Sequence, residues 1–361
     1  MTPRDAIPRF SKGRTLLMAL LVSGLSVVAL GIGLNALQPE EAPLDRVRDL
    51  IFGAEWTLLI LGILAMSLGM IFVAIRWRCL LPDRDGIPPT GLTGMVCSGL
   101  LLNYAVPGPA GELASAYLVK KRYNKPATVA LAASLHARFI GLGTAGLMAG
   151  LVSLFADLPI PPAHNDKIQI AVGLIAIGAL GVALLSAFPT ILIRLSQLTA
   201  GTLGRHLPGR LGKASSMLNL GVCRLAEGLG EVGRLGFWPY AQAALWACLA
   251  HLFVFLGIVL ACQAMGISPY LPGILLSYCA ATAAVVALIA FPGSQLGWDL
   301  LLVAFLKFTA GLSPVEAWAV VILVRVQQLL LLMVGAGFLV HYGRRLETEE
   351  PLEPTEVERP A

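Results

Sequence analysis

Long apolar blocks, each of about 20 residues, constrain the fold of this chain more than any other feature of its sequence. A helix of about 20 residues crosses the roughly 30 Å hydrocarbon core of a bilayer. Of the 361 residues, 57% are hydrophobic and only 13% are charged, whereas a soluble domain usually carries about 25% charged residues. The charged residues lie mainly between the apolar blocks. The sequence therefore predicts an all-α integral membrane protein.

Six of the apolar blocks are long enough to cross the membrane once each. They cover residues 16–37, 57–75, 128–155, 168–193, 239–264 and 316–340. The first block resembles a signal peptide, but its apolar part is longer and no small-residue cleavage site follows it. We therefore interpret this block as a retained transmembrane helix.

Two further apolar stretches, 92–119 and 270–310, are each interrupted by a Pro-Gly pair. The arms of the first are about 21 Å and 16 Å long at 1.5 Å per residue, so neither crosses alone. We interpret both stretches as re-entrant helical hairpins, although the arms of the second could each span. A non-helical break at that depth must be buried in protein or line a polar cavity. The residues assigned to the breaks are Pro107, Gly108, Gly111, Pro292, Gly293 and Gly297.

Basic residues are concentrated on one side of this arrangement. If each hairpin returns to its own side, nearly all Lys and Arg residues fall in the connections on one face. These connections are 1–15, 76–91, 120–127, 194–238 and the C-terminal end. The other face carries Arg46, Arg48 and Lys167. Positive residues mark the cytoplasmic side, so we expect both termini in the cytoplasm.

We assign residues 1–343 to a membrane domain and residues 344–361 to a disordered acidic tail rich in Glu and Pro. Within the connection 194–238, apolar residues recur at helical spacing opposite Lys213, Arg224 and Arg234; they are Leu211, Leu218, Val222, Leu225, Leu229 and Val232. It is either an amphipathic helix on the inner leaflet or a solvated cytoplasmic connection.

The two broken stretches begin a repeated pattern, over residues 92–155 and 270–340. In each copy a hairpin carries an acid, a short loop with proline follows, and the next helix carries an arginine. Glu112 and Arg138 are 26 residues apart, as are Asp299 and Arg325. Three crossings separate the two hairpins, so they enter from opposite faces. This is an inverted repeat, in which matching Gly/Pro breaks point to a transporter's substrate site.

Ionisable residues inside apolar helices are costly and need a partner or water. The residues that we place at membrane depth as candidates for substrate binding are Glu112, Arg138, Asp299, Arg325, Lys307 and Asn103. The arginines could hold a lipid phosphate, and the acids could balance charge, accept an amine or exchange protons. Alternatively, each acid and arginine form a structural ion pair, Lys307 reaches an interface, and Asn103 joins two helices. The same two roles, lining the substrate cavity or forming hydrogen bonds between helices, are open to Gln295, Gln327 and Gln328.

Other polar residues give weaker signals. We interpret His136 and His251 as hydrogen-bond partners between helices. Ser313 and Glu316 predict a capping box at a helix start. The six cysteines form no CxxC pair, and no metal site, cofactor or nucleotide-binding motif is predicted. The net charge of +5 reflects topology, so no nucleic-acid partner is expected.

Leu102-Asn103 before Pro107-Gly108, the Gly111-Glu112 pair and the later arginine helix resemble a known family. This is the flippase-like membrane domain of lysylphosphatidylglycerol synthase/flippases, including its stand-alone forms. The resemblance covers about residues 50–340. It implies a protein of the bacterial inner (plasma) membrane that moves or positions a polar-headed lipid, anionic or isoprenoid-derived. The aminoacyl-transferase domain is absent, so the resemblance does not carry over its activity.

Three positions depart from the family pattern. Pro109 and Ser115 stand where basic residues are frequent, and Asp299 stands where a Glu is expected. These departures concern the choice of headgroup. Our leading hypothesis is lipid transport. The alternatives are an accessory subunit of a lipid or hopanoid biosynthesis pathway and, third, a membrane-embedded lipid-modifying enzyme, for which no HExxH or GxSxG motif is present.

Overall fold

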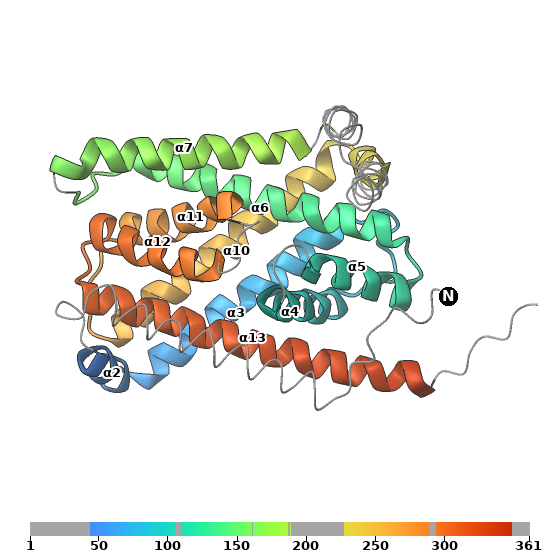
Figure 1. Ribbon diagram of the computed structural model, residues 1–361, viewed down its shortest axis with the longest axis horizontal. Coiled ribbons are helices and arrows are strands. Elements are labelled where there is room, and N and C mark those ends of the chain that lie inside the picture. Colours follow the sequence, from blue (N-terminus) through green and yellow to red (C-terminus); the bar gives the residue numbers. More distant parts are fainter. Residues whose placement is uncertain are drawn as a thin grey trace, which may run out of the picture.

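The computed structural model describes residues 44–105, 110–160, 162–186, 188, 227–288 and 294–348. Every regular element in these ranges is helical, which confirms the all-α prediction for this part of the chain. The helices are α2 (Leu44–Phe52), α3 (Trp56–Cys79), α4 (Pro89–Ala105), α5 (Ala110–Tyr123), α6 (Ala127–Phe155), α7 (Pro162–Ser186), α10 (Phe237–Ala264), α11 (Leu271–Leu288), α12 (Ser294–Thr309) and α13 (Pro314–Thr348). Figure 1 shows them as one bundle of long, tilted helices.

Five of the described helices are long and apolar enough to cross a membrane. The qualifying segments are Trp56–Cys79, Ala127–Phe155, His164–Leu184, Phe237–Ala264 and Pro314–His341. They correspond to five of the six predicted spans, and the remaining one, 16–37, lies outside the described residues. The helix α7 begins at Pro162, before the predicted start at residue 168, because proline suits the first turn of a helix. Its described part ends at Ser186.

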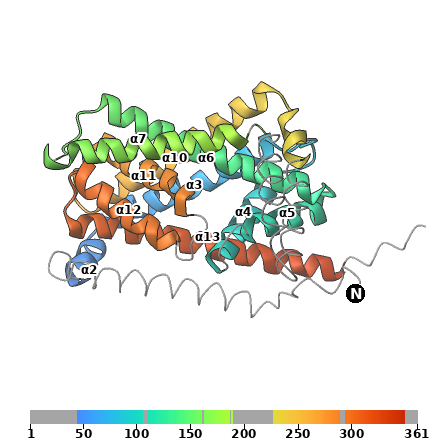
Figure 2. The ribbon, with the colours of Figure 1, turned by 45° about the horizontal axis from the view of Figure 1, so that its top comes forward.

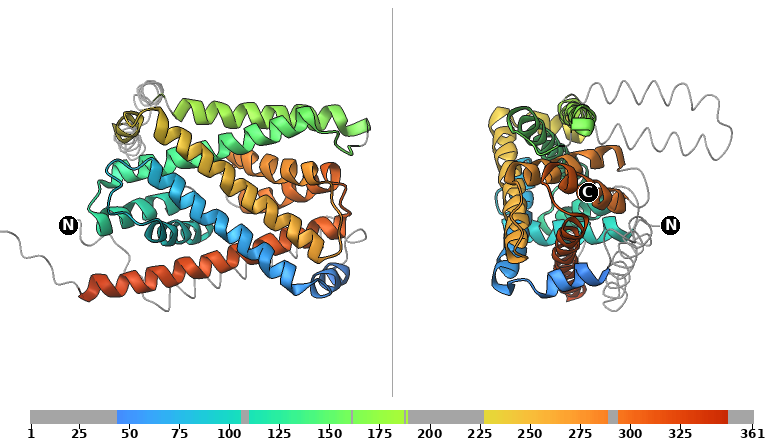
Figure 3. Two further views of the ribbon diagram at one scale, coloured as in Figure 1. Left: turned by 180° about the vertical axis from the view of Figure 1, so that it is seen from behind. Right: turned by 90° about the vertical axis from the view of Figure 1, so that its left-hand side faces the viewer.

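Helices α3 and α10 form the most extensive contact between two described helices and run antiparallel (Figure 3, left). A side chain at Gly62 would begin 2.9 Å from the carbonyl oxygen of Gly257, and one at Gly257 would begin 2.6 Å from that of Gly62. One at Gly69 would begin 3.2 Å from the carbonyl oxygen of Ala250. In lipid, small residues of this kind let helices approach closely and pack through van der Waals contact.

Replacing Gly257 with alanine is expected to destabilise the bundle by about 1–3 kcal/mol, because the added methyl group overlaps the backbone of α3. The melting temperature of the purified protein in detergent measures the effect. The matched control is Gly178→Ala on α7, where no atom lies within 4 Å of the added methyl group. An equal loss of melting temperature in both variants would contradict close packing as the cause.

Each broken stretch forms a pair of neighbouring antiparallel helices. Between α4 and α5, the Ser115 hydroxyl donates to the Met95 carbonyl oxygen over 2.9 Å, and the Gly111 backbone N–H donates to Asn103 Oδ1 over 2.7 Å. Because residue numbers fall along α4 as they rise along α5, the two helices run in opposite directions.

The pair α11 and α12 is joined at the end away from its break. The Tyr270 backbone N–H donates to the Ala310 carbonyl oxygen over 3.2 Å. Thr309 Oγ1 lies 2.9 Å from Ser277 Oγ and 3.1 Å from the Gly273 carbonyl oxygen. Figures 1 and 2 both place the α11–α12 pair and the α4–α5 pair in opposite halves of the bundle. Their entry from opposite membrane faces stays a prediction.

The four arms have 17, 14, 18 and 16 residues in α4, α5, α11 and α12. At 1.5 Å per residue they are about 26, 21, 27 and 24 Å long, all below the roughly 30 Å of hydrocarbon. The first two arms are longer than predicted because α4 starts at Pro89 and α5 continues to Tyr123.

The predicted break residues divide into two groups. Pro107, Gly108, Pro292 and Gly293 lie outside the described residues. Gly111 and Gly297, by contrast, lie inside α5 and α12, so their assignment to the breaks is wrong. At Gly111 the physical reason is close packing, since any side chain there would collide with the Gly99 carbonyl oxygen and the Asn103 side chain.

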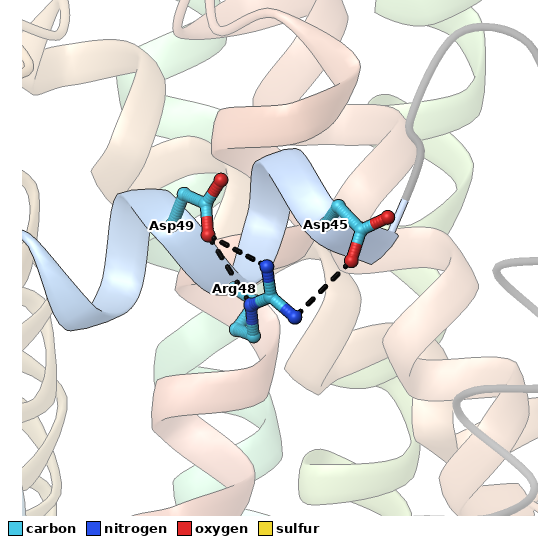
Figure 4. Close-up of polar contacts among 3 residues, drawn as sticks. All are labelled: Asp45, Arg48 and Asp49. Carbon is cyan, nitrogen blue, oxygen red and sulfur yellow. Dashed lines mark hydrogen bonds and ion pairs between the residues drawn. The ribbon is translucent and has the colours of Figure 1, made fainter.

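The short helix α2 lies in the segment before α3 that the sequence assigned only as an external connection. It packs against the core through the buried side chain of Val47 and contacts α13. On its exposed side, Arg48 pairs with Asp45 over 3.2 Å and with Asp49 over 3.1 Å (Figure 4). Exposed ion pairs contribute about 0–1 kcal/mol, so burial of the apolar face holds α2 in place.

Two segments outside the spans bear on the earlier assignments. Residues 227–233, the described end of the 194–238 connection, are helical. Leu229 and Val232 are buried in one apolar cluster with alanines of α6, so the apolar face of this part packs against protein. Residues 194–226 lie outside the described part. The helix α13 continues to Thr348, past the predicted start of the tail, and residues 349–361 are not described.

Candidate functional site

The acid and the arginine of the first repeat form an ion pair in the interior of the bundle. Glu112 lies in the first turn of α5, where the positive end of the helix dipole favours a carboxylate. Its Oε1 accepts a hydrogen bond from Arg138 Nη1 on α6. Its Oε2 is buried and has no hydrogen-bond partner. The Arg138 side chain remains 29% exposed, so the pair is open on one side.

The acid and the arginine of the second repeat form a closed pair. Arg325 of α13 donates from Nε to Asp299 Oδ1 over 2.8 Å, and its Nη2 lies 2.7 Å from Oδ2. This two-pronged geometry is the strongest arrangement for arginine and carboxylate. Nη1 donates to Gln328 Oε1 over 2.6 Å, and the guanidinium lies 5.6 Å from the centre of the Trp298 ring. The Arg325 and Asp299 side chains are only 5% and 3% exposed.

The equal spacing in the sequence therefore does bring each acid to its arginine. The two pairs differ in what surrounds them. The Asp299–Arg325 pair satisfies both carboxylate oxygens and is sealed by neighbours. The Glu112–Arg138 pair leaves one carboxylate oxygen without a partner and one cation partly accessible. This difference between the repeats was not predicted from the sequence.

Arg76 is a further charged residue of the interior, and its assignment to a connection that follows the predicted span 57–75 is wrong. It is only 7% exposed, because α3 continues to Cys79 rather than ending at the predicted residue 75. Its guanidinium packs directly over Gly141 of α6, in the space that any side chain there would occupy. The neighbouring Trp77 donates from Nε1 to the Ala130 carbonyl oxygen over 3.2 Å and fixes this face of α3 against α6.

A histidine and a tyrosine complete the polar centre beside Arg76. His251 of α10 donates from Nε2 to the Gly141 carbonyl oxygen over 2.9 Å. The Tyr278 hydroxyl of α11 lies 3.3 Å from His251 Nδ1 and donates to it, since Nδ1 is then the unprotonated nitrogen. Arg76 is close enough to both side chains for electrostatic interaction. His251 is thus a hydrogen-bond partner between helices, as the sequence predicted, and it joins three of them.

Helix α11 connects this polar centre to the sealed pair. Thr282 lies one helical turn after Tyr278 and accepts a hydrogen bond from Trp298 Nε1 over 3.5 Å. Trp298 in turn lies against the Arg325 guanidinium. Helix α11 therefore carries neighbours of both Arg76 and the Asp299–Arg325 pair.

A comparison with known families identifies this bundle. Residues 16–336 match the family described as the lysylphosphatidylglycerol synthase transmembrane region. The chain belongs to this family. The match confirms the resemblance that the sequence motifs indicated, and it covers most of the 361 residues. No curated protein and no solved structure matches the chain.

Membership of the lysylphosphatidylglycerol synthase transmembrane-region family places the chain in a class of membrane domains associated with lipid flippase and synthase systems. One departure from the family pattern has a structural explanation. Ser115, which stands where a basic residue is frequent, is 4% exposed and bonded to the backbone of α4. A long basic side chain there would separate α4 from α5.

The remaining candidates lie away from the open pair or serve the packing of helices. Asn103 holds the first turn of α5 against α4. Gln327 reaches Ser67 of α3 over 3.5 Å. Lys307 lies in the last turn of α12, about two turns from Asp299, and is half-buried. The side chain of Gln295 lies outside the described part. In the described residues, no group of three or more His, Cys, Asp or Glu side chains could hold a metal ion.

Proposed function

We propose that this protein binds the polar headgroup of a membrane lipid inside the bundle and moves it across the plasma membrane. One observation carries the proposal: the Glu112–Arg138 pair is deep in an apolar bundle and yet open. The Arg138 side chain is 29% exposed and Glu112 Oε2 has no hydrogen-bond partner. A lipid headgroup supplies the hydrogen-bond donors and acceptors that this pair lacks.

The energetics favour a polar group, rather than hydrocarbon, next to the Glu112–Arg138 pair. A charged side chain at membrane depth costs about 2.5–3.5 kcal/mol on insertion scales, so an accessible arginine there must face water or a polar ligand. A pair that served stability alone gains most from complete hydrogen bonding, as in the Asp299–Arg325 pair. The open pair lacks that closure, which supports a binding role.

The arrangement of the helix pairs supports movement rather than static binding. In the proposed topology, the α4–α5 and α11–α12 pairs are re-entrant and enter from opposite faces, with both chain termini in the cytoplasm. Inverted repeats with broken helices are the architecture of many transporters, and their substrate sites lie between the repeats. The headgroup would cross through the polar region between the pairs while the acyl chains remain in the surrounding lipid.

Reconstitution into liposomes tests this function. Headgroup-fluorescent lipids in both leaflets are exposed to an impermeant quencher, and transbilayer movement is the rate at which inner-leaflet fluorescence disappears. We expect faster loss than in protein-free liposomes, with the lipid chemically unchanged on chromatography. A rate equal to that of protein-free liposomes contradicts transport and favours an accessory role. A new lipid product would instead indicate an enzyme.

A further inference from the structure

We propose that Arg76 binds the ligand together with Arg138, and that their shared site selects a phosphate-bearing lipid of net negative charge. This inference rests on the proposed function and names the substrate class of the same site. It goes beyond the pattern seen in the sequence, where Arg76 was counted as a cytoplasmic residue.

The two arginines converge on one face of α6. Arg138 and Gly141 are one helical turn apart and therefore lie on the same side of that helix. The Arg76 guanidinium comes from α3 and packs over Gly141. The two cations are close enough to repel one another. A residue larger than glycine at position 141 would push Arg76 away from this place.

The local charges do not cancel. Arg138 is paired with Glu112, whereas no carboxylate in the described part of the chain pairs with Arg76. Arg76 Nε is buried and has no hydrogen-bond partner. His251 and Tyr278 lie beside it, but their hydrogen bonds run to each other, to Gly141 and to Thr282, and neither supplies a negative charge. The site of Glu112, Arg138 and Arg76 therefore carries one uncompensated positive charge.

An anion with several acceptor oxygens satisfies this arrangement. Arginine does not lose its proton in proteins, so burial cannot neutralise Arg76. Its planar fork of N–H groups matches the oxygens of a phosphate, which can accept two hydrogen bonds at once. A lipid with one net negative charge balances the site. A zwitterionic lipid brings its own cation and leaves the positive charge uncompensated.

The test is the binding of defined lipids to the detergent-purified full chain, measured by native mass spectrometry without any transport step. Phosphatidylglycerol and phosphatidylcholine with the same acyl chains are compared, and inorganic phosphate is the water-soluble probe. We expect the wild type to prefer phosphatidylglycerol by roughly 10-fold or more, the range of a charged hydrogen bond. Arg76→Gln is expected to lose this preference and Arg76→Lys to retain part of it.

The matched control is Arg84→Gln, which removes the same charge from the surface loop after α3, where Arg84 reaches Gln242. It should keep the preference. Equal binding of both lipids by the wild type overturns the inference. An unchanged preference in a folded Arg76→Gln variant overturns it too. Binding of inorganic phosphate in place of the lipid overturns the lipid assignment. Lipid preference without transbilayer movement contradicts the proposed function but agrees with this binding site.

Discussion

Transbilayer lipid movement is expected to fall at least about tenfold when Arg138 is replaced by glutamine. The guanidinium is the accessible cation of the open pair, and glutamine keeps a polar side chain while removing its charge. Hydrogen bonds to charged groups contribute about 1.5–3 kcal/mol, which corresponds to roughly 10-fold to 100-fold in binding. The liposome assay described above measures the rate for the wild type and the variant at equal protein content.

The loss of Arg138 also leaves the buried carboxylate of Glu112 without its ion-pair partner, so folding must be controlled. The double variant E112Q/R138Q removes both charges together and leaves two amides that can hydrogen-bond to each other. We expect this variant to melt close to the wild type and still to move lipid slowly. Movement at the wild-type rate in a folded double variant would remove this pair from the transport mechanism.

Replacing Arg325 with alanine is expected to cost about 3–5 kcal/mol of stability, because it leaves Asp299 as an unpaired charge in a sealed site. The Asp299 and Arg325 side chains are only 3% and 5% exposed, so water cannot replace the lost partner. We expect little folded protein in size-exclusion chromatography and a markedly lower melting temperature. From the sequence alone, Arg138 and Arg325 are equivalent; the structure gives them different expected outcomes.

The double variant D299L/R325M separates structure from function at this pair. Apolar residues of similar volume often replace a buried ion pair without loss of stability. We expect the double variant to recover most of the folded yield and to keep lipid movement. If it folds and moves no lipid, the Asp299–Arg325 pair is part of the transport site and not only a link between α12 and α13.

Several features of the site could be predicted because they depend on residues close in sequence or on a repeated spacing. The capping box is present, with the Ser313 N–H bonded to Glu316 Oε2 over 2.7 Å and the Glu316 N–H to Ser313 Oγ over 3.4 Å. The matched spacing of 26 residues pointed to the partners Glu112–Arg138 and Asp299–Arg325, whose direct contact the sequence left open as an alternative to substrate binding.

Other features depend on contacts between helices far apart in the chain. Arg76 was misplaced because its environment is set by Gly141 and His251, which no local window of hydropathy includes. Gly111 was assigned to a break because glycine after Pro-Gly suggests irregular backbone, whereas its actual role is to admit the backbone of Gly99. In both cases the missing information was the identity of the neighbour.

The sequence by itself determined that this protein lies in a membrane, which apolar blocks form its described spans, and which acid matches which arginine. These properties follow from the free energy of transferring an apolar helix into hydrocarbon and from the spacing of charged residues. Both depend on the order of residues along the chain. Only the tertiary structure decided that one ion pair is open, that the other is sealed, and that Arg76 is buried in the bundle over Gly141. Exposure and charge balance depend on the side chains that surround a group, and helix packing alone determines which side chains those are.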